Sequence, residues 1–419
     1  MCLCFPPLWS GEMPKLLLVE QYFFPEGWGG AEIPRDIAIG MREAGFEVDV
    51  LCSRDQYAPM AEQHAEDPSS RGIRIFRVPR IFPGPVHRLK LIRILWFCLC
   101  ALPRLFFHRG VDLYVTQTNP LLIVPIVAVV SSLRRKPFII IAQDLYPEAL
   151  FAAGVSGPDS LLGRALHRLF SWSYGRATRV VALGPFMRGR ILDKGVRAQR
   201  IRTISNWATG DIRLRDAGEN PLRAEWGLAD RFVVLYSGNI GVGHEFETLL
   251  RGVQRALSAG VDAVVVFIGG GARLAEVRAL VSTLGLSDRV LFKSFVPADV
   301  LPLSLGIADL AVVTLREGFQ GIVVPSKLLG YMARGIPALY IGPDSDIAGM
   351  IRDADCGACC PPGDDASVAD VLRRSASERA LLRQWGENGR RCYAARFARE
   401  LALPQYVDVV REALACARS

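Results

Sequence analysis

Short apolar runs alternate with glycine-bearing loops and amphipathic stretches along this chain, and the alternation starts twice. The first block contains the apolar run 15–20, a loop with three glycines, an amphipathic stretch over 31–44 and a second apolar run at 47–51. The second block begins again with the run 232–236 and the glycine-rich loop 237–243. Continuous apolar runs of this length are typical of strands buried in a parallel sheet. The pattern therefore predicts an α/β protein with two doubly wound, Rossmann-like parallel sheets, each covered by helices.

A chain of 419 residues fits two such domains of about 200 residues each. Ligands bind beyond the carboxyl ends of the strands in sheets of this kind, so we expect the two domains to face each other across a cleft. The start of the chain lacks the basic and apolar segments of a secretory signal, and Met13 is an alternative translation start. The expected divisions are an N-terminal extension over 1–13, a first domain over 14–207, a second domain over 208–396 and a helix over 397–419 that packs back on the first domain.

Positive charge is concentrated in the first half of the chain. Residues 1–205 carry 26 Lys and Arg against 17 Asp and Glu, whereas the remainder carries 24 against 25. The segment 71–110 contains nine basic residues and no acidic one. This bias indicates an anionic partner, either a membrane surface or a nucleic acid. Because no recognisable RNA- or DNA-binding module accompanies the charge, we expect no nucleic acid and favour the membrane.

The segment 88–107 is the strongest candidate for membrane contact. It is shorter than the roughly 18 apolar residues of a membrane span, and Pro103 is expected to end or kink a helix there. Trp96 and Phe97 suit the interfacial zone. The alternative is a helix packed on the first sheet, because the run is apolar nearly all round. Headgroup contacts are expected from Arg88, Lys90, Arg93 and Arg104.

The loop after the run 232–236 is a candidate phosphate site. Gly238, Gly241 and Gly243 allow backbone N–H groups to approach a ligand, and the following helix directs its positive end to the same place. His244 at the start of that helix could add a donor. The alternative is a plain turn between a strand and a helix.

A second candidate lies where a helix begins after Pro325. Ser326 is expected as its N-cap, and Gly335 as its end. Lys327 then places a cation in the first turn, where it opposes the helix dipole. A cation at the positive end of a helix is unfavourable, and such exceptions to local preferences tend to mark functional sites. A diphosphate bound there would be attracted both by the lysine and by the helix end. The alternative is an exposed lysine without a role.

A third candidate follows the strand predicted over 138–142. Asp144 and Glu148 lie on a loop at the carboxyl end of that strand, where a carboxylate could hold a sugar hydroxyl or take a proton. The alternative for Asp144 is to cap the following helix.

The sequence gives no support for a metal site. Cys356 and Cys359 have CxxC spacing, but no second pair or nearby His completes a zinc site, and we expect reduced, mostly buried thiols. Asp344 and Asp346 resemble a DxD metal motif, yet a helix predicted to begin near Ile347 explains Asp346 as a cap. We therefore expect neither a metal nor a cofactor.

Six motifs in matching order resemble the GT-B glycosyltransferases of family 4, in particular the bacterial surface-polysaccharide group that is similar to N-acetylfucosamine transferases. The resemblance covers about 15–411. Its motifs are 29–32 (Gly-Gly-Ala-Glu), 143–148 (Gln-Asp-Leu-Tyr-Pro-Glu), 205–207 (Ser-Asn-Trp), 237–239 (Ser-Gly-Asn) with His244, 325–327 (Pro-Ser-Lys) and 361–364 (Pro-Pro-Gly-Asp).

The resemblance implies transfer of a hexosyl or N-acetylhexosaminyl group with retention of configuration from a nucleoside-diphosphate sugar, expected to be UDP-linked. The acceptor would be a lipid-linked glycan or polysaccharide at the cytoplasmic face of the cell membrane, in surface polysaccharide or lipopolysaccharide biosynthesis. No metal is needed for the donor in this family. Residues implied on the acceptor and reaction side are Gly29, Gly30, Glu32 and Asp144, and those implied at the donor are Ser237, Gly238, Asn239, His244, Gly269, Phe295, Val296, Ser326, Lys327 and Leu328.

The chain departs from the family pattern at two places. Many members carry two glutamates seven residues apart, but the corresponding positions are Ile322 and Gly330, and Glu317 lies five residues too early. The donor loop often carries Arg or Lys where this chain has Val242. His244 and Lys327 are therefore expected to supply most of the charge neutralisation.

Other functions fit less well. A non-hydrolysing sugar-nucleotide epimerase shares the two-domain build but needs carboxylates that are scarce near Ser326. A basic nucleic-acid-binding protein would use the first half of the chain. A dinucleotide dehydrogenase would need an intact GxGxxG after a strand, which the chain lacks.

Overall fold

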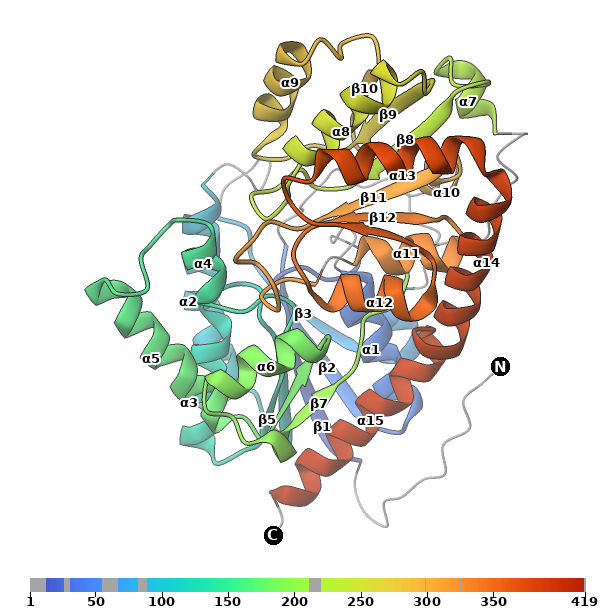
Figure 1. The fold of residues 1–419 in the computed structure, drawn as a ribbon. Coiled ribbons are helices and arrows are strands. Elements are labelled where there is room, and N and C mark those ends of the chain that lie inside the picture. The colour runs from blue at the N-terminus through green and yellow to red at the C-terminus, as the bar shows by residue number, and fades with distance from the viewer. Residues whose placement is uncertain are drawn as a thin grey trace. The chain divides into compact units, whose positions relative to one another are not determined.

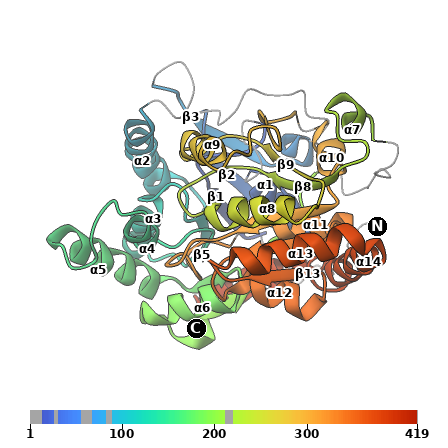
Figure 2. The same cartoon turned by 45° about the horizontal axis from the view of Figure 1, so that its top comes forward.

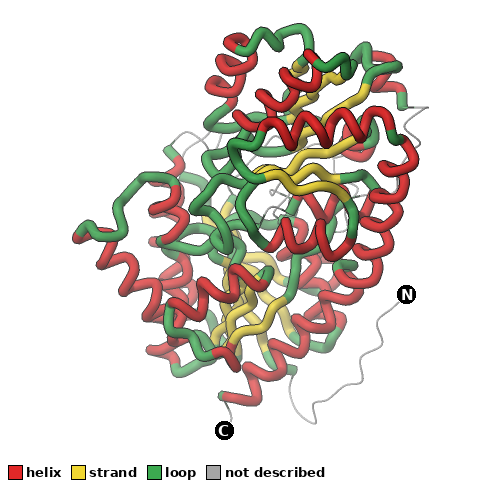
Figure 3. Tube along the Cα trace, in the orientation of Figure 1, coloured by secondary structure: helices red, strands yellow, loops and turns green. Residues whose placement is uncertain are grey.

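The computed structural model describes residues 13–25, 31–54, 67–81, 89–210, 220–297, 299–324 and 326–417. The chain forms two compact units (Figure 1). The first unit comprises Met1–Asn206, Gly321–Val323 and Arg399–Ser419, and the second comprises Trp207–Gln320 and Val324–Ala398. Each unit contains one parallel sheet between layers of helices (Figure 3). The prediction of two Rossmann-like parallel sheets is therefore confirmed.

The sheet of the first unit has seven strands in the order β3-β2-β1-β4-β5-β6-β7. Its inner strands are almost entirely buried, which explains why most of them consist of continuous apolar runs, whereas the edge strands β3 and β7 are partly exposed. The strand order reverses between β1 and β4. The strands are β1 (Lys15–Val19), β2 (Glu47–Ser53), β3 (Arg74–Val78), β4 (Leu113–Gln117), β5 (Phe138–Ile141), β6 (Arg179–Ala182) and β7 (Ile201–Thr203).

Helices cover both faces of this sheet. On one face, α1 (Glu32–Glu43) packs against α15 (Arg399–Cys416), so the C-terminal helix returns to the first unit as predicted (Figure 1). Glu412 of α15 fixes this return by accepting hydrogen bonds from Arg179 and Arg202 at 2.9 and 2.7 Å. The other face carries α2 (Lys90–Phe107), α3 (Ile123–Arg134), α4 (Glu148–Ala152), α5 (Leu161–Arg176) and α6 (Pro185–Asp193).

The helix α2 differs from its prediction in one respect. It continues through Pro103 to Phe107, so Pro103 does not end it, which was one of the two expected effects of this proline. Proline removes one backbone donor, and a helix with enough packing along its length tolerates that loss. Phe97, Ala101 and Leu105 supply such packing, because their side chains are fully buried.

The sheet of the second unit has six strands in the order β10-β9-β8-β11-β12-β13, and its order reverses between β8 and β11. Figure 2 shows α8 and α13 side by side over one face, where α9 also lies, and α11, α12 and α14 cover the other face. The strands are β8 (Phe232–Ser237), β9 (Ala263–Ile268), β10 (Val290–Lys293), β11 (Leu310–Thr314), β12 (Ala338–Ile341) and β13 (Gly357–Cys360). The helices are α7 (Pro221–Glu225), α8 (Glu247–Ser258), α9 (Leu274–Thr283), α10 (Leu301–Leu305), α11 (Lys327–Arg334), α12 (Asp346–Ala354), α13 (Asp365–Ser377) and α14 (Arg379–Arg396).

Both sheets thus have a switch point, the place where consecutive strands begin to be added on the other side. In open α/β sheets the crevice beyond the carboxyl ends of the strands at such a point is where ligands bind. The switch points are β1/β4 in the first unit and β8/β11 in the second.

Candidate active site

The switch point of the second sheet is built from closely packed glycine loops. Gly238 and Gly269 have positive φ angles of 129° and 134°, which residues with side chains rarely adopt. A Cβ atom on Gly269 would lie 2.2 Å from the carbonyl oxygen of Gly238, so the loops after β8 and β9 touch backbone to backbone. A Cβ on Gly238 would lie 2.5 Å from Cε of Lys327. Glycine at this position therefore leaves room for the lysine side chain.

Lys327 is the first residue of α11 and lies over Tyr236 of β8. Its ammonium group donates a hydrogen bond to Tyr236 Oη at 2.9 Å and lies 3.4 Å from His244 Nε2. It also lies 4.6 Å from the centre of the Tyr236 ring, within cation–π range. No carboxylate among the described residues pairs with Lys327, and burial lowers the pKa of its ammonium group to about 7. The site therefore contains a desolvated cation that lacks a counter-ion.

His244 is held in one tautomer by the end of β11. Its Nδ1 donates to the carbonyl oxygen of Thr314 at 2.9 Å, which leaves Nε2 as the acceptor that faces Lys327. Burial and the nearby Lys327 charge lower the pKa of His244 to about 3. The ring is therefore neutral near pH 7, so the positive charge expected of His244 is missing in this state.

Two arginines that sequence reasoning missed surround the same loop. Arg316 follows β11, and its backbone N–H and guanidinium donate to Gly243 O and Val242 O at 2.8 and 3.2 Å. Arg273 donates to the carbonyl oxygen of His244 and pairs with Glu276. Arg316 thus brings a cation beside Val242, where the family motif places one in the loop itself. Its position just past β11 at the switch point is the signal that could have revealed it.

The other expected donor residues lie around these loops. Phe295 is exposed and its ring lies 3.2 Å from a Cβ built on Gly269, whereas Val296 is half-buried. Ser237 donates its N–H to Tyr331 Oη of α11 at 3.3 Å, and Asn239 accepts from Tyr236 Oη at 2.7 Å. The side chain of Leu328 is fully buried, so only its backbone N–H in the first turn of α11 is suited to a ligand.

Ser326 occupies the N-cap position of α11 as predicted, but its side chain makes no capping hydrogen bond. Its φ and ψ angles of −68° and −13° are helical, whereas a capping serine adopts an extended conformation. The hydroxyl and the first N–H groups of α11 are therefore not bonded to each other.

In the first unit, the loop that carries Asp144 is fixed at successive residues. The N–H groups of Gln143 and Asp144 both donate to Thr118 Oγ1 at 3.0 Å. The next N–H, of Leu145, donates to Ile322 O at 2.9 Å. The helix α4 has Pro147 at its N-cap position, so the structure contradicts the capping alternative for Asp144.

A buried lysine holds the end of this loop. Lys194 Nζ lies 2.5 and 2.6 Å from the two carboxylate oxygens of Glu148, and it donates to Tyr146 O at 3.0 Å. Its side chain is almost completely buried, and this burial lowers its pKa although Glu148 acts in the opposite direction. Glu148 is therefore engaged in fixing the loop. No sequence motif identified Lys194.

The remaining expectations fall into three groups. Gly29 and Gly30 lie outside the described residues, and Glu32 is the half-buried first residue of α1. Ile322 is buried in place of the first family glutamate, Gly330 lies within α11 in place of the second, and Glu317 is exposed after β11. None of these three positions provides a carboxylate beside Lys327.

The paired aspartates are arranged differently from the capping prediction. Ser345, not Asp346, is the N-cap of α12, because its side chain accepts from Ala348 N–H. Asp346 is the first helical residue, and Asp344 binds Arg352 at 2.5 Å. Within the described ranges no group of three His, Cys, Asp or Glu side chains could hold a metal ion, and Cys356, Cys359 and Cys360 are free thiols.

Comparison with known proteins identifies the family. Residues 29–207 match the model of the Glycosyl transferase 4-like domain, and residues 219–392 match that of Glycosyl transferases group 1. The chain is 30% identical over 273 residues to "Probable glycosyltransferase WbjE" of Pseudomonas aeruginosa, an alignment that covers 63% of this chain and 66% of that protein, slightly less than two thirds of its length. It is 24% identical over 419 residues to "Putative colanic acid biosynthesis glycosyl transferase WcaI" of Escherichia coli (strain K12), with 95% and 100% of the two chains covered.

A solved structure has the same fold. The Anabaena protein Alr3699/HepE, solved in complex with UDP and glucose, superimposes with a TM-score of 0.72 at 16% identity over 95% of this chain and 99% of that one. The two Rossmann-like units are those of the GT-B fold. The chain therefore belongs to the glycosyltransferases, with a Glycosyl transferase 4-like domain followed by a group 1 domain.

Proposed function

We propose that this glycosyltransferase moves a hexosyl or N-acetylhexosaminyl group from a UDP-linked sugar to a lipid-linked or polysaccharide acceptor, with retention of configuration, in surface polysaccharide biosynthesis. The observation that carries the proposal is Lys327, a desolvated cation without a carboxylate partner in the described chain, at the start of a helix and beside a glycine loop. The name of WcaI supports a polysaccharide product, and the complex of HepE with UDP and glucose supports the donor class. The family match favours transfer over the epimerase and dehydrogenase alternatives.

In this proposal the donor diphosphate binds at the β8/β11 switch point. Lys327 donates to its oxygens, together with the free N–H groups in the first turn of α11, including that of Leu328, and with the Ser326 hydroxyl. The backbone of Ser237, Gly238 and Asn239 approaches from the other side, and His244 keeps the Lys327 ammonium directed toward the loop. The surfaces of Gly269, Phe295 and Val296 contact the base. As the bond to the leaving diphosphate breaks, Lys327 and Arg316 stabilise the developing negative charge.

On the reaction side we propose that Asp144 binds a hydroxyl of the reacting sugar or acceptor. We assign Gly29, Gly30 and Glu32 to the same side because the family motif implies it. The loop of Asp144 is fixed by Thr118 and by the Glu148–Lys194 pair, so its backbone is positioned before substrate binds. Such preorganisation avoids an entropic cost during the reaction.

The proposed transfer is tested by incubating the protein with a panel of sugar nucleotides and lipid-linked glycan acceptors. Mass spectrometry then detects acceptor-dependent release of the nucleoside diphosphate and the new glycosidic product. The Lys327→Ala variant should release far less of it. Product formation that does not depend on an added acceptor, or that is unchanged in the variant, would contradict the proposal.

We also propose that the protein is cytoplasmic and associates peripherally with the anionic inner face of the cell membrane. No helix in the described ranges is long and apolar enough to cross a membrane. The support comes from α2, which exposes a stripe of large apolar side chains at helical spacing. This α2 stripe consists of Leu91, Leu95, Leu99, Leu102 and Phe106.

The α2 stripe is not the face expected from the sequence. Arg93 and Phe97 are buried and therefore pack inward, whereas Trp96 is half-buried and its indole donates to Pro79 O at 2.9 Å. Of the other predicted headgroup ligands, Arg104 is exposed, while Arg88 lies outside the described residues. The sequence placed the apolar character of this helix correctly and its outward face wrongly, because the run is apolar nearly all round.

Flotation with vesicles of phosphatidylglycerol and phosphatidylcholine tests this attachment. Leu99→Ser should weaken binding several-fold, whereas Leu401→Ser, an exposed leucine on α15, should leave it unchanged. Equal binding of both variants would remove the α2 stripe from the membrane contact.

A further inference from the structure

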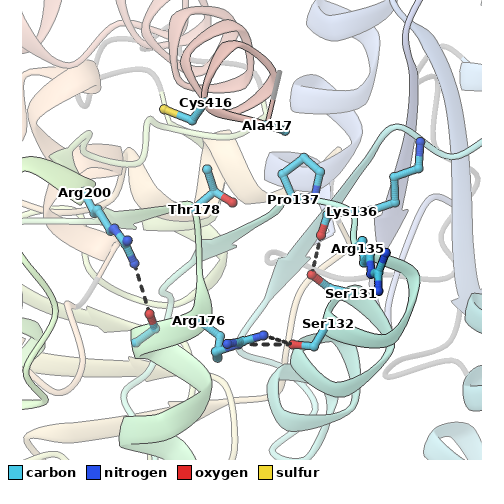
Figure 4. Close-up of a pocket in the computed structure, with 11 residues that line it drawn as sticks. Ser131, Ser132, Arg135, Lys136, Pro137, Arg176, Thr178, Arg200, Cys416 and Ala417 are labelled. Carbon is cyan, nitrogen blue, oxygen red and sulfur yellow. Dashed lines mark hydrogen bonds between the residues drawn. The ribbon is translucent and has the colours of Figure 1, made fainter. Parts of the chain in front are cut away.

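A basic pocket lies at the amino ends of β5, β6 and β7, the end of the first sheet away from its switch point. Its volume is about 460 Å³. Figure 4 shows side chains from the ends of α3 and α5, the starts of the strands and the end of α15 around it. The lining residues are Ser131, Ser132, Arg135, Lys136, Pro137, Gly175, Arg176, Thr178, Arg200, Cys416 and Ala417.

The charge of this pocket is uncompensated. None of the described residues that line it is acidic, and only Lys136 has a carboxylate partner, Asp112 at 3.2 Å. Across the described ranges, no carboxylate pairs with Arg135, Arg176 or Arg200. Arg176 instead donates to Ser132 Oγ at 3.1 and 3.2 Å, and Arg200 donates to Gly175 O at 3.1 Å (Figure 4).

Two nearby arginines outside the pocket, in contrast, have a carboxylate partner. Arg179 and Arg202 both bind Glu412 of α15. The C-terminal ends of α3, α5 and α15 also meet the pocket, but each contributes only about half a unit of negative charge. Three unpaired guanidinium groups therefore exceed what these three helix ends can offset.

The backbone conformation of Arg135 also indicates that this pocket has a function. This residue follows α3 with φ at 53°, in the left-handed region where a helix usually places glycine. An arginine there costs stability relative to glycine. A strained residue that supplies an unpaired charge to a cavity indicates a function that outweighs the cost.

Apolar side chains stand beside the cations on the same helices. Leu133 is 67% exposed and adjoins Ser132 on α3, and Trp172 is 44% exposed one turn before Arg176 on α5. A ligand that combines a phosphate with an adjoining apolar part, such as a lipid, matches this arrangement.

We propose that the pocket binds a phosphoryl group, supplied by the headgroup of an anionic phospholipid. The planar donor forks of Arg135 and Arg176 and the hydroxyl of Thr178 complement the oxygens of a phosphate, whereas the Ser131 hydroxyl already donates to Lys136 O. The proposal rests on this pocket alone and does not depend on the transferred sugar or the identity of the donor.

The test compares two charge-matched double variants of the full chain. Arg135→Gln/Arg176→Gln changes the pocket, and Arg188→Gln/Arg197→Gln removes two cations elsewhere in the first unit. Binding of inorganic phosphate by calorimetry and of phosphatidylglycerol vesicles by flotation is measured for each. Because the donor site could also bind phosphate, every titration is repeated in a Lys327→Ala background.

The pocket variant should weaken binding of both probes about tenfold or more, as expected for lost hydrogen bonds to a charged group. The control variant should change it less than about twofold. Loss of phosphate binding with unchanged vesicle binding would support the phosphoryl site and overturn its lipid source. Equal weakening in both variants, or no binding of either probe, would overturn the proposal.

Arg135→Gly separates this role from a structural one. Glycine accepts the left-handed backbone, so the variant should unfold at a temperature no lower than that of the parent protein. It should nevertheless bind phosphate and vesicles more weakly. A variant that is more stable and binds both probes normally would exclude Arg135 from the site.

Discussion

The two switch points have the same topology and opposite chemistry. At β8/β11, Lys327 and Arg316 place positive charge beside glycine loops. At β1/β4, the buried side chains are Glu20, Gln21 and Gln117. Burial raises the pKa of Glu20 well above its ordinary value, which favours the neutral form of this carboxyl. One switch point thus suits an anion, and the other suits neutral polar groups.

The first switch point also has hydrogen-bonding capacity that is not used. Neither the oxygen nor the nitrogen of the Gln21 amide has a partner among the described residues, and the nitrogen of Gln117 has none. Buried amides are ordinarily bonded, so these atoms are suited to water or to sugar hydroxyls. Identical sheet topology therefore fixes where ligands bind, while the residues after each strand decide which ligand chemistry fits.

The largest expected effect concerns Asp144 in the first unit. Asp144→Asn should lower turnover by about 10²–10⁴, the usual range for a group that takes part in proton transfer. Its fold should be unaffected, because the backbone contacts to Thr118 and Ile322 remain. Turnover measured with saturating donor and acceptor gives the answer. Normal turnover together with a lower melting temperature would make Asp144 a structural residue.

The next effect concerns the charged switch point. Lys327→Ala should weaken binding of the nucleoside diphosphate by about 1.5–3 kcal/mol, the range for a hydrogen bond to a charged group. Calorimetry with the Asp144→Asn variant is the control, because that change lies in the other unit and should leave the affinity unaltered. Unchanged affinity in folded Lys327→Ala would remove the lysine from the donor site.

The pH dependence of binding should follow the same lysine. Its pKa in the free protein is about 7, so nucleoside-diphosphate affinity should fall by up to about tenfold per pH unit above that value as the lysine loses its charge. His244, with a pKa of about 3, stays neutral throughout. Calorimetry between pH 6 and pH 9 measures the profile, and Lys327→Ala should flatten it. A parent profile as flat as that of the variant would contradict the assignment.

Stability without ligand should show the opposite trend. The folded pKa of Lys327 is lowered, so between about pH 7 and its ordinary value the unfolded chain binds more protons than the folded one. The contribution of this residue to the free energy of unfolding therefore increases with pH across that window. Denaturant titrations of the parent and of Lys327→Ala isolate this contribution.

Much of this arrangement could be predicted from the sequence, because apolar runs and glycines are local signals. The two sheets, the loop after β8 and the start of α11 at Lys327 follow from such patterns. Long-range partners carry no such signal. Lys194 and Glu148, which form an ion pair, are 46 residues apart in the sequence. Arg316 and Val242, which are joined by a hydrogen bond, are 74 residues apart.

Two further errors have physical causes. The sequence does not indicate which face of α2 points outward, because this helix is apolar on nearly every side. Arg93, which was expected to be exposed, is therefore found buried. The neutral state of His244 results from its burial and from the nearby charge of Lys327, both of which arise only in the folded structure.

The neutral switch point is tested by Gln21→Met. Methionine is similar in size and has no strong hydrogen-bonding groups, so the variant should gain about 1 kcal/mol in the free energy of unfolding if the amide is unsatisfied. Urea denaturation measures this value. If the amide serves a sugar hydroxyl, the acceptor KM should also rise while the affinity for nucleoside diphosphate stays constant. A loss of stability would mean that the amide is already bonded, for instance to buried water, and the contrast between the switch points would weaken.

The smallest expected effect is that of a chelator. A saturating chelator should leave transfer near its normal rate, because Lys327, Arg316 and the first turn of α11 can stabilise the leaving diphosphate without a divalent ion. The alternative ligands, Asp344 and Asp346, are poorly placed, since Asp344 is bound to Arg352 and Asp346 is buried at the start of α12. The rate of product formation with and without EDTA measures the effect. Loss of activity that magnesium or manganese restores would make the charge at the β8/β11 switch point insufficient on its own. Asp344→Asn would then show whether this aspartate is one of the ligands, because the variant would no longer respond to the added metal.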